Sequence, residues 1–81
     1  MRDKVAIVTG GGRGLGRAFA RALAAKGAAV VIAEIDGRSA DRVAKEITDA
    51  AGKAYAVETD VSDEASVAAM VATTVAKFGG I

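Results

Sequence analysis

The sequence predicts an α/β fold in which a doubly wound parallel sheet is built in the order strand, helix, strand, helix, strand, helix. Short apolar runs alternate with longer segments whose apolar residues recur about every 3.6 residues. A loop with five glycines in seven residues follows the first apolar run, and acidic residues follow the second and third. Strands that alternate with helical segments are typical of βαβ units and a parallel sheet.

The composition excludes several classes of protein. The 81 residues include 11 Lys and Arg against 10 Asp and Glu, so the net charge of +1 gives no electrostatic reason to expect nucleic acid or an anionic membrane. Cys and His are absent, which excludes a disulfide scaffold and the usual zinc sites, and we expect no metal. No apolar run reaches about 18 residues, and the first is far shorter than a signal-peptide core of about 7–15, so we expect a cytoplasmic protein.

The first strand and helix flank the glycine-rich loop. Residues 5–8 form a continuous apolar run, the pattern of a parallel strand covered on both faces. The helix is expected from Leu15 to Lys26, with Gly27 as the residue that ends it. The apolar residues at helical spacing are expected to face the sheet, and they are Leu15, Ala18, Phe19, Ala22 and Leu23.

Two further strand–helix pairs complete the series. The strands are expected at residues 28–33 and 54–57. The second helix is expected from Arg38 to Ala51, closed by Gly52, with a buried stripe of Ala40, Val43, Ala44, Ile47 and Ala51. The third helix is expected to begin at an N-cap, Ser62, and to stop at Gly79-Gly80, with Val67, Met70, Val71, Thr74 and Phe78 inward. Right-handed crossovers predict the strand order 3-2-1, with the first two helices on one face and the third on the other.

The loop from Thr9 to Gly16 has the features of an anion site. The first N–H groups of a helix lack partners within the helix, and glycine removes the Cβ that would keep a phosphate away from them. A nucleoside-triphosphate loop is rejected because Arg17-Ala18 follows Gly16 where Lys-Ser/Thr is required. The Gly-x-Gly-x-x-Gly fingerprint fits poorly at its third glycine. The alternative without a ligand is a loop that only connects a strand and a helix.

The pattern Thr-Gly-x-x-x-Gly-x-Gly is met in full, and it resembles the cofactor loop of the short-chain dehydrogenase/reductase family. The resemblance implies a Rossmann-like fold and an NAD(P)-dependent oxidoreductase that transfers hydride between the cofactor and an alcohol or carbonyl substrate. It implies that residues 1–81 are the amino-terminal part of a single NAD(P)-binding Rossmann domain, in a parent that is a homo-oligomer. The loop residues that it assigns to cofactor binding are Thr9, Gly10, Gly12, Arg13, Gly14, Leu15 and Gly16.

Acidic residues after the second strand bear on the choice of cofactor. Glu34, followed by Ile35, can accept hydrogen bonds from both hydroxyls of the adenosine ribose, and its charge repels a 2′-phosphate. Arg13 resembles the 2′-phosphate contact of some NADP-preferring relatives, and Arg38 offers a second cation. We give the charge of Glu34 more weight than the two cations and expect NAD to be preferred over NADP. The alternatives are that Glu34 is only a solvated acid and that Asp36 caps the second helix.

After the third strand, Asp60 and Val61 match a pair that in the family lies against adenine, the carboxylate near its amino group and the next N–H near a ring nitrogen. The alternative is that Asp60 only opens the turn into the third helix. We expect no catalytic residue in this chain, because Tyr55 is followed by Thr59 and does not match the family's Tyr-x-x-x-Lys. The chain alone is therefore expected to be inactive.

Two other functions stay open at this point. A non-catalytic dinucleotide-binding module would need no further residues. An S-adenosylmethionine-dependent methyltransferase also has a glycine loop after its first strand, but that loop reads Gly-x-Gly-x-Gly with an acid before it. Here Val8-Thr9 precede Gly10, which fits the dehydrogenase pattern better.

Overall fold

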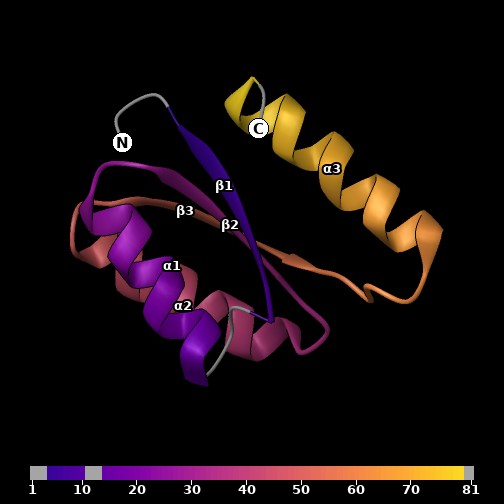
Figure 1. Ribbon diagram of the computed structural model, residues 1–81, viewed down its shortest axis with the longest axis horizontal. Helices are drawn as coiled ribbons and strands as arrows, with labels where there is room; N and C mark the ends of the chain where they lie inside the picture. The colour runs from indigo at the N-terminus through magenta and orange to yellow at the C-terminus, as the bar shows by residue number, and fades with distance from the viewer. Residues whose placement is uncertain (1–3, 11–13, 80–81) are drawn as a thin grey trace.

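The computed structural model describes residues 4–10 and 14–79 (Figure 1). Its elements are β1 (Val5–Thr9), α1 (Gly14–Ala25), β2 (Ala29–Glu34), α2 (Gly37–Asp49), β3 (Lys53–Glu58) and α3 (Glu64–Phe78). Within these residues three parallel strands form a sheet in the order β1-β2-β3, which is the expected order 3-2-1 counted from the other edge. Figure 1 shows α1 and α2 on one face and α3 on the other. The predicted fold class is confirmed.

The middle strand β2 is the centre of the core. All six of its residues are buried, because neighbouring strands pair with both of its edges and helices cover both of its faces. Side chains of a strand alternate between the two faces. Val30 and Ile32 accordingly pack in one apolar cluster with α1 and α2, and Val31 packs in a second cluster with Met70 of α3. The strand expected at residues 28–33 is confirmed as β2, one residue further along. The covering of both faces that was predicted for residues 5–8 is met only in part, because β1 is half-buried.

Helix α1 differs from the prediction in its rotation about its own axis. Of the expected stripe only Leu23 is even partly buried, whereas Leu15 and Phe19 are 70% and 55% exposed. The residues of α1 that pack in the core are Leu23 from the expected stripe and, outside that stripe, Ala20 and Ala24. Small side chains at four-residue spacing let the helix backbone approach the sheet, and the larger apolar residues are left on the outer side.

Helix α2 follows its prediction closely. Ala40, Val43 and Ile47 are buried, but Ala51 is exposed because the helix has already ended at Asp49. The chain turns at Ala51, which has a positive φ of 68°. The N–H of Gly52 then donates to the carbonyl of Ile47 over 2.9 Å, and a Cβ at this glycine would lie 2.7 Å from the Ile47 side chain. Gly52 therefore follows the helix at a position where the backbone passes too close to Ile47 to leave room for a side chain.

Helix α3 begins one residue later than expected. Its N-cap is Asp63, whose carboxylate accepts from the N–H of Ala65, and the prediction of Ser62 is wrong because the Ser62 side chain binds Asp60 instead. The left-handed Gly79, with φ of 82°, ends the helix as expected. The expected inward residues are buried or half-buried except Val71, which is 36% exposed. Among the described residues, none of the helices combines the length and the apolarity needed to cross a membrane.

Candidate functional site

The carboxyl ends of the three strands enclose a hollow of about 380 Å³. Parallel strands bring these ends to one edge of the sheet, where ligands of α/β proteins commonly bind. Six predicted residues line the hollow together, namely Thr9, Gly10, Glu34, Ile35, Asp60 and Val61. Ala33 and Thr59 also line it, and the prediction missed them. The strand pairing could have indicated Ala33, since it lies directly opposite Thr9 in the parallel register.

The loop after β1 is fastened to β2. The N–H of Gly10 donates to the carbonyl of Ala33 over 2.9 Å. Gly10 and Gly14 have φ of 65° and 59°, a conformation that side chains with a Cβ rarely adopt. A Cβ at Gly14 would meet nothing within 4 Å, so the space in front of this residue is open. Gly14, Leu15 and Gly16 begin α1, whereas the predicted residues Gly12 and Arg13 lie outside the described residues.

Glu34 is held at the end of β2 with its side chain largely enclosed. The residue is 8% exposed, and Oε2 accepts the N–H of Asp36 over 3.1 Å. Asp36 itself caps α2, because its carboxylate accepts from the N–H and the hydroxyl of Ser39 and from the N–H of Arg38. The two acids therefore have separate roles, and Glu34 is the one that lines the hollow. Ile35 between them is 63% exposed.

Asp60 is fixed by two serines. Its Oδ1 accepts the hydroxyl of Ser62 over 2.6 Å and the N–H of the same residue over 3.0 Å. These two hydrogen bonds, the hydroxyl first, lower the pKa of the Asp60 carboxyl. The N–H of Asp60 donates to Oγ of Ser66 on α3 over 2.9 Å. Asp60 thus opens the turn into α3, as one alternative predicted, while it also lines the hollow.

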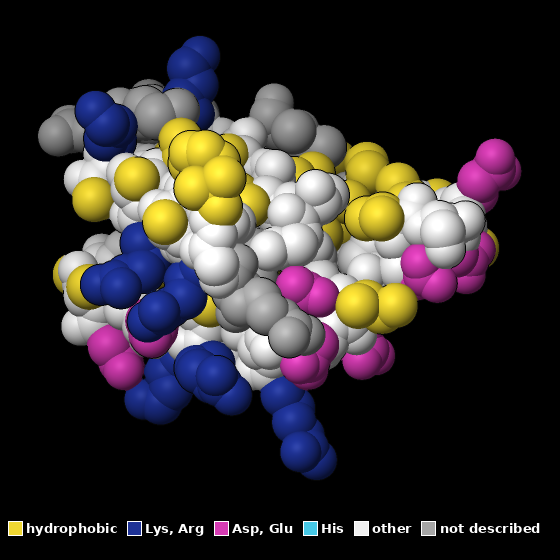
Figure 2. All heavy atoms as spheres, turned by 60° about the horizontal axis from the view of Figure 1, so that its bottom comes forward, with side chains coloured by type: hydrophobic (Ala, Val, Ile, Leu, Met, Phe, Trp, Pro, Cys, Tyr) yellow, Lys and Arg dark blue, Asp and Glu magenta, His cyan; other side chains and the backbone are white. Residues whose placement is uncertain are grey.

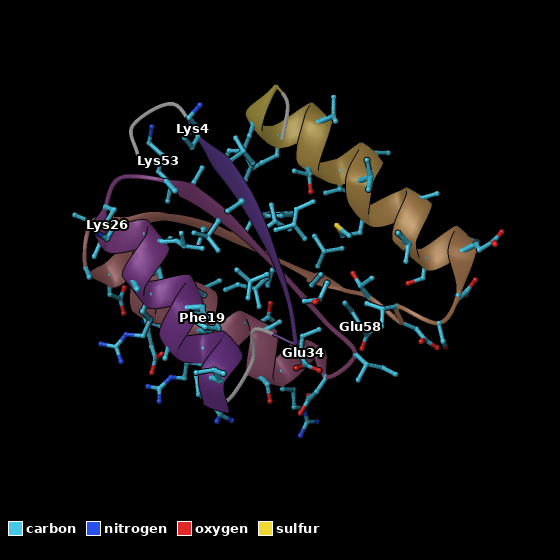
Figure 3. All side chains as sticks on the ribbon, in the orientation of Figure 1. Lys4, Phe19, Lys26, Glu34, Lys53 and Glu58 are labelled. Atoms are coloured by element: carbon cyan, nitrogen blue, oxygen red, sulfur yellow. The ribbon has the colours of Figure 1, made fainter. Side chains whose placement is uncertain are left out.

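The two ends of the parallel strands, carboxyl and amino, differ in charge. Glu34 and Glu58 are paired across β2 and β3 in the parallel register, and Figure 3 shows them beside each other at the carboxyl edge. Lys4 and Lys53 lie at the opposite edge, where their strands begin. The hollow is therefore at an acidic edge, which disfavours a ligand with additional negative charge close to Glu34.

The remaining features of the described residues do not belong to this hollow. A larger groove of about 460 Å³ lies between α1 and α2, lined mostly by alanines together with Arg21 and Glu46. Tyr55 lies inside β3 as expected, but it is 39% exposed, with the ammonium group of Lys77 4.8 Å from its ring centre, so the expectation of a packing residue is not met. No group of three or more Asp and Glu residues in the described ranges is arranged to hold a metal ion.

Curated proteins of similar sequence include dehydrogenases. The chain is 48% identical over 79 residues to the cis-4-hydroxycyclohexanecarboxylate dehydrogenase of Sinomonas cyclohexanicum, a match that covers 98% of this chain and 31% of that protein. It is 44% identical over 84 residues to the galactitol 2-dehydrogenase of Agrobacterium fabrum, covering 100% of this chain and 30% of that protein. The chain thus spans about a third of the length of these relatives.

The solved structures that resemble this chain include oxidoreductases of the same kind. A 3-ketoacyl-(acyl-carrier-protein) reductase from Brucella melitensis, complexed with NADH, superposes with a TM-score of 0.89 at 47% identity, covering 96% of this chain and 31% of that one. A hydroxysteroid dehydrogenase from Escherichia coli gives a TM-score of 0.94 at 35% identity, covering 96% and 32%. The sequence model of the family described as short chain dehydrogenase matches residues 4–81. The chain therefore belongs to the short-chain dehydrogenase family.

Proposed function

We propose that these residues bind the adenosine and pyrophosphate parts of an NAD(P) cofactor for an oxidoreductase that acts on an alcohol or carbonyl group. The observation that carries the proposal is the meeting of Gly10, Glu34 and Asp60 around one hollow at the carboxyl edge of the sheet. Support comes from the relatives, which are dehydrogenases, and from a structural neighbour that is complexed with NADH.

The pyrophosphate would lie at the start of α1. The space that a Cβ would occupy at Gly14 is open, so the first N–H groups of the helix are accessible to an anion. The helix dipole places partial positive charge at the same end, and no acidic residue in the first turn opposes it. The residues assigned to this end are Thr9, Gly10, Gly12, Arg13, Gly14, Leu15 and Gly16.

The adenosine would lie in the hollow between β2 and β3. The Glu34 carboxylate would accept hydrogen bonds from the ribose hydroxyls, and its low exposure limits its freedom to turn away. The lowered pKa of Asp60 keeps this carboxyl ionised at neutral pH, as an acceptor for an adenine amino group. Ile35 and Val61 offer exposed apolar surface beside these acceptors. We propose NAD over NADP, because a 2′-phosphate would be brought near Glu34 and Glu58.

When bound, the nicotinamide of such a cofactor exchanges hydride with the substrate carbon. The part of this chain proposed here holds the other end of the molecule. The carboxyls of Glu34 and Asp60 are oriented by hydrogen bonds within the protein, and we assign them to binding instead of proton transfer. We propose that the proton of the substrate is moved by residues outside these 81.

The proposal is tested by calorimetric titration of NAD, NADP and S-adenosylmethionine into the protein that carries this sequence. We expect saturable binding of NAD, weaker binding of NADP and none of S-adenosylmethionine. The variant Asp60→Ala should weaken NAD binding, whereas Asp49→Ala, at the exposed end of α2, should not change it. Absence of NAD and NADP binding by the folded protein would contradict the proposal.

A further inference from the structure

An ion pair joins the cofactor loop helix to its neighbour. Nε of Arg17 on α1 donates to Oε1 of Glu46 on α2 over 2.9 Å, and Nη2 donates to Oε2 over 2.6 Å. This two-point geometry fixes the guanidinium plane against the carboxylate. Figure 2 shows Lys and Arg side chains gathered with a few acidic ones on the side of the molecule where α1 and α2 lie.

The position of Arg17 connects the pair to the cofactor loop. Arg17 directly follows Gly16, the last glycine of the motif, and belongs to the opening turns of α1. The packing of α1 on the sheet is slight, because Ala20 is the one residue of this helix that is fully buried. Small apolar contacts resist sliding and rotation of a helix weakly, so a directed contact to α2 has a large share in setting where the first N–H groups point.

The other partner belongs to the well-packed part of the molecule. Helix α2 buries Ala40, Val43 and Ile47, and its N-cap Asp36 also donates its N–H to Glu34. Helix α2 therefore connects directly to the residue proposed to bind the ribose. We infer that the Arg17–Glu46 pair is a positioning device, which sets the pyrophosphate-binding end of α1 relative to the ribose-binding end of β2. This inference rests on the proposed function.

Two roles of Arg17, as a positioning residue and as a simple positive charge, predict opposite changes in cofactor affinity when the charge of Glu46 is removed. The hydrogen bond from Arg17 is the main cause that lowers the pKa of Glu46, and the positive charges of Arg17 and Arg21 on α1 and of Arg42 on α2 act in the same direction. If Arg17 only attracted an anionic cofactor, removing the negative charge of Glu46 would tighten cofactor binding. If the pair positions α1, removing either partner loosens the helix and weakens binding.

The test measures NAD dissociation constants by calorimetry, in the protein that carries this sequence, for Arg17→Gln, Glu46→Gln and the double charge reversal Arg17→Glu with Glu46→Arg. We expect each single variant to weaken NAD binding by about three- to tenfold, which corresponds to the interaction energies measured for residues in contact. The double variant should regain most of the lost affinity. Adenosine, which lacks the phosphates, should bind the variants as it binds the original protein. The control is Lys45→Gln, which removes an exposed ion pair within α2 to Asp49, over 3.0 Å, and should leave all constants unchanged.

Tighter NAD binding by Glu46→Gln would overturn the inference, because Arg17 would then act as a free charge. Lower melting temperatures with unchanged NAD constants would also overturn it, since the pair would then serve stability alone. If the original protein binds NAD and the variants bind it equally, only this inference fails. If the original protein binds no NAD, the proposed function fails and the inference fails with it.

Discussion

The two ends of the candidate site are built on regions that are packed very differently. The ribose end lies on β2, where Val30 to Ala33 are fully buried between two layers of helices. The pyrophosphate end lies between β1, whose residues are half-buried or exposed, and α1, whose large apolar residues Leu15 and Phe19 face outward. One end of the site is therefore positioned by the core, and the other depends on glycine geometry and on a few directed contacts.

The first prediction compares the stability of the two regions and has the largest expected effect. Ile32→Ala should lower the free energy of unfolding by about 2–5 kcal/mol, because it removes buried contacts and leaves a cavity in the core. Phe19→Ala should change it by less than about 0.5 kcal/mol, because this side chain is 55% exposed. Urea denaturation measures both. Equal losses would show that α1 is packed as tightly as β2.

The second prediction breaks the pyrophosphate end without touching the core. Gly14→Val should weaken NAD binding by about a hundredfold or more, because a branched residue is strained at φ of 59° and would fill the open space before the helix N–H groups. Calorimetry with NAD measures the loss, and far-UV circular dichroism should stay close to that of the original protein. Retained affinity with an unchanged spectrum would show that the pyrophosphate binds elsewhere.

The contrast between the regions also explains how far the sequence could predict the fold. Residues 28–33 are apolar throughout, which is typical of a buried strand, so β2 was predicted to within one residue. In α1 nearly every position is Ala, Leu, Phe or Gly apart from Arg17 and Arg21, so more than one apolar stripe has helical spacing. The pattern alone could not select the rotation, which depends on how closely Ala20 lets the helix approach the sheet.

The candidate site shows the same division. Glu34 was predicted from its place at a strand end beside the glycine loop, and Asp60 from the resemblance to the family together with its place at the same end of the sheet. Both line the hollow. The N-cap of α3 was assigned one residue too early because Ser62 and Asp63 are equally suitable by type. Only the three-dimensional turn shows that the Ser62 hydroxyl binds Asp60. The Arg17–Glu46 pair joins two helices far apart in sequence, and no local pattern indicates it.

The third prediction concerns the ribose end. Glu34→Ser combined with Ile35→Arg should shift the ratio of kcat/KM for NAD to that for NADP toward NADP by about tenfold or more, since it removes a repulsive charge and adds an attractive one. Steady-state kinetics with both cofactors in the protein that carries this sequence measures the ratio. Glu58→Gln provides a graded control and should shift the ratio less, because its side chain does not line the hollow. An unchanged ratio in the double variant would contradict the assignment of Glu34.

The fourth prediction concerns the open edge of β1. Within the described residues β1 pairs with β2 alone, and an unpaired apolar strand is a template for association. Residues 1–81 produced alone should therefore self-associate and show no dehydrogenase activity. Light scattering after size-exclusion chromatography measures the mass. Phe19→Glu, which replaces an apolar side chain of α1 that is 55% exposed, should reduce this mass toward that of a monomer. A monodisperse monomer with cooperative unfolding would contradict this expectation.

The smallest expected effect is a pH dependence of stability at the turn after β3. The hydroxyl of Ser62 is the main cause that holds the pKa of Asp60 below its ordinary value of 3.8, and the N–H of Ser62 is the second. Because the pKa is lower in the folded than in the unfolded chain, the stabilisation is fully present above pH 3.8 and is lost as the pH falls through the lowered value. Ser62→Ala removes the hydroxyl and should reduce this acid-dependent loss, measured by urea denaturation at a series of pH values.

The matched variant Ser66→Ala removes the acceptor of the Asp60 N–H and leaves the carboxylate contacts in place. It should lower stability by the same amount at every pH, and a pH-dependent loss in this variant instead would show that the Asp60 carboxyl is held by α3.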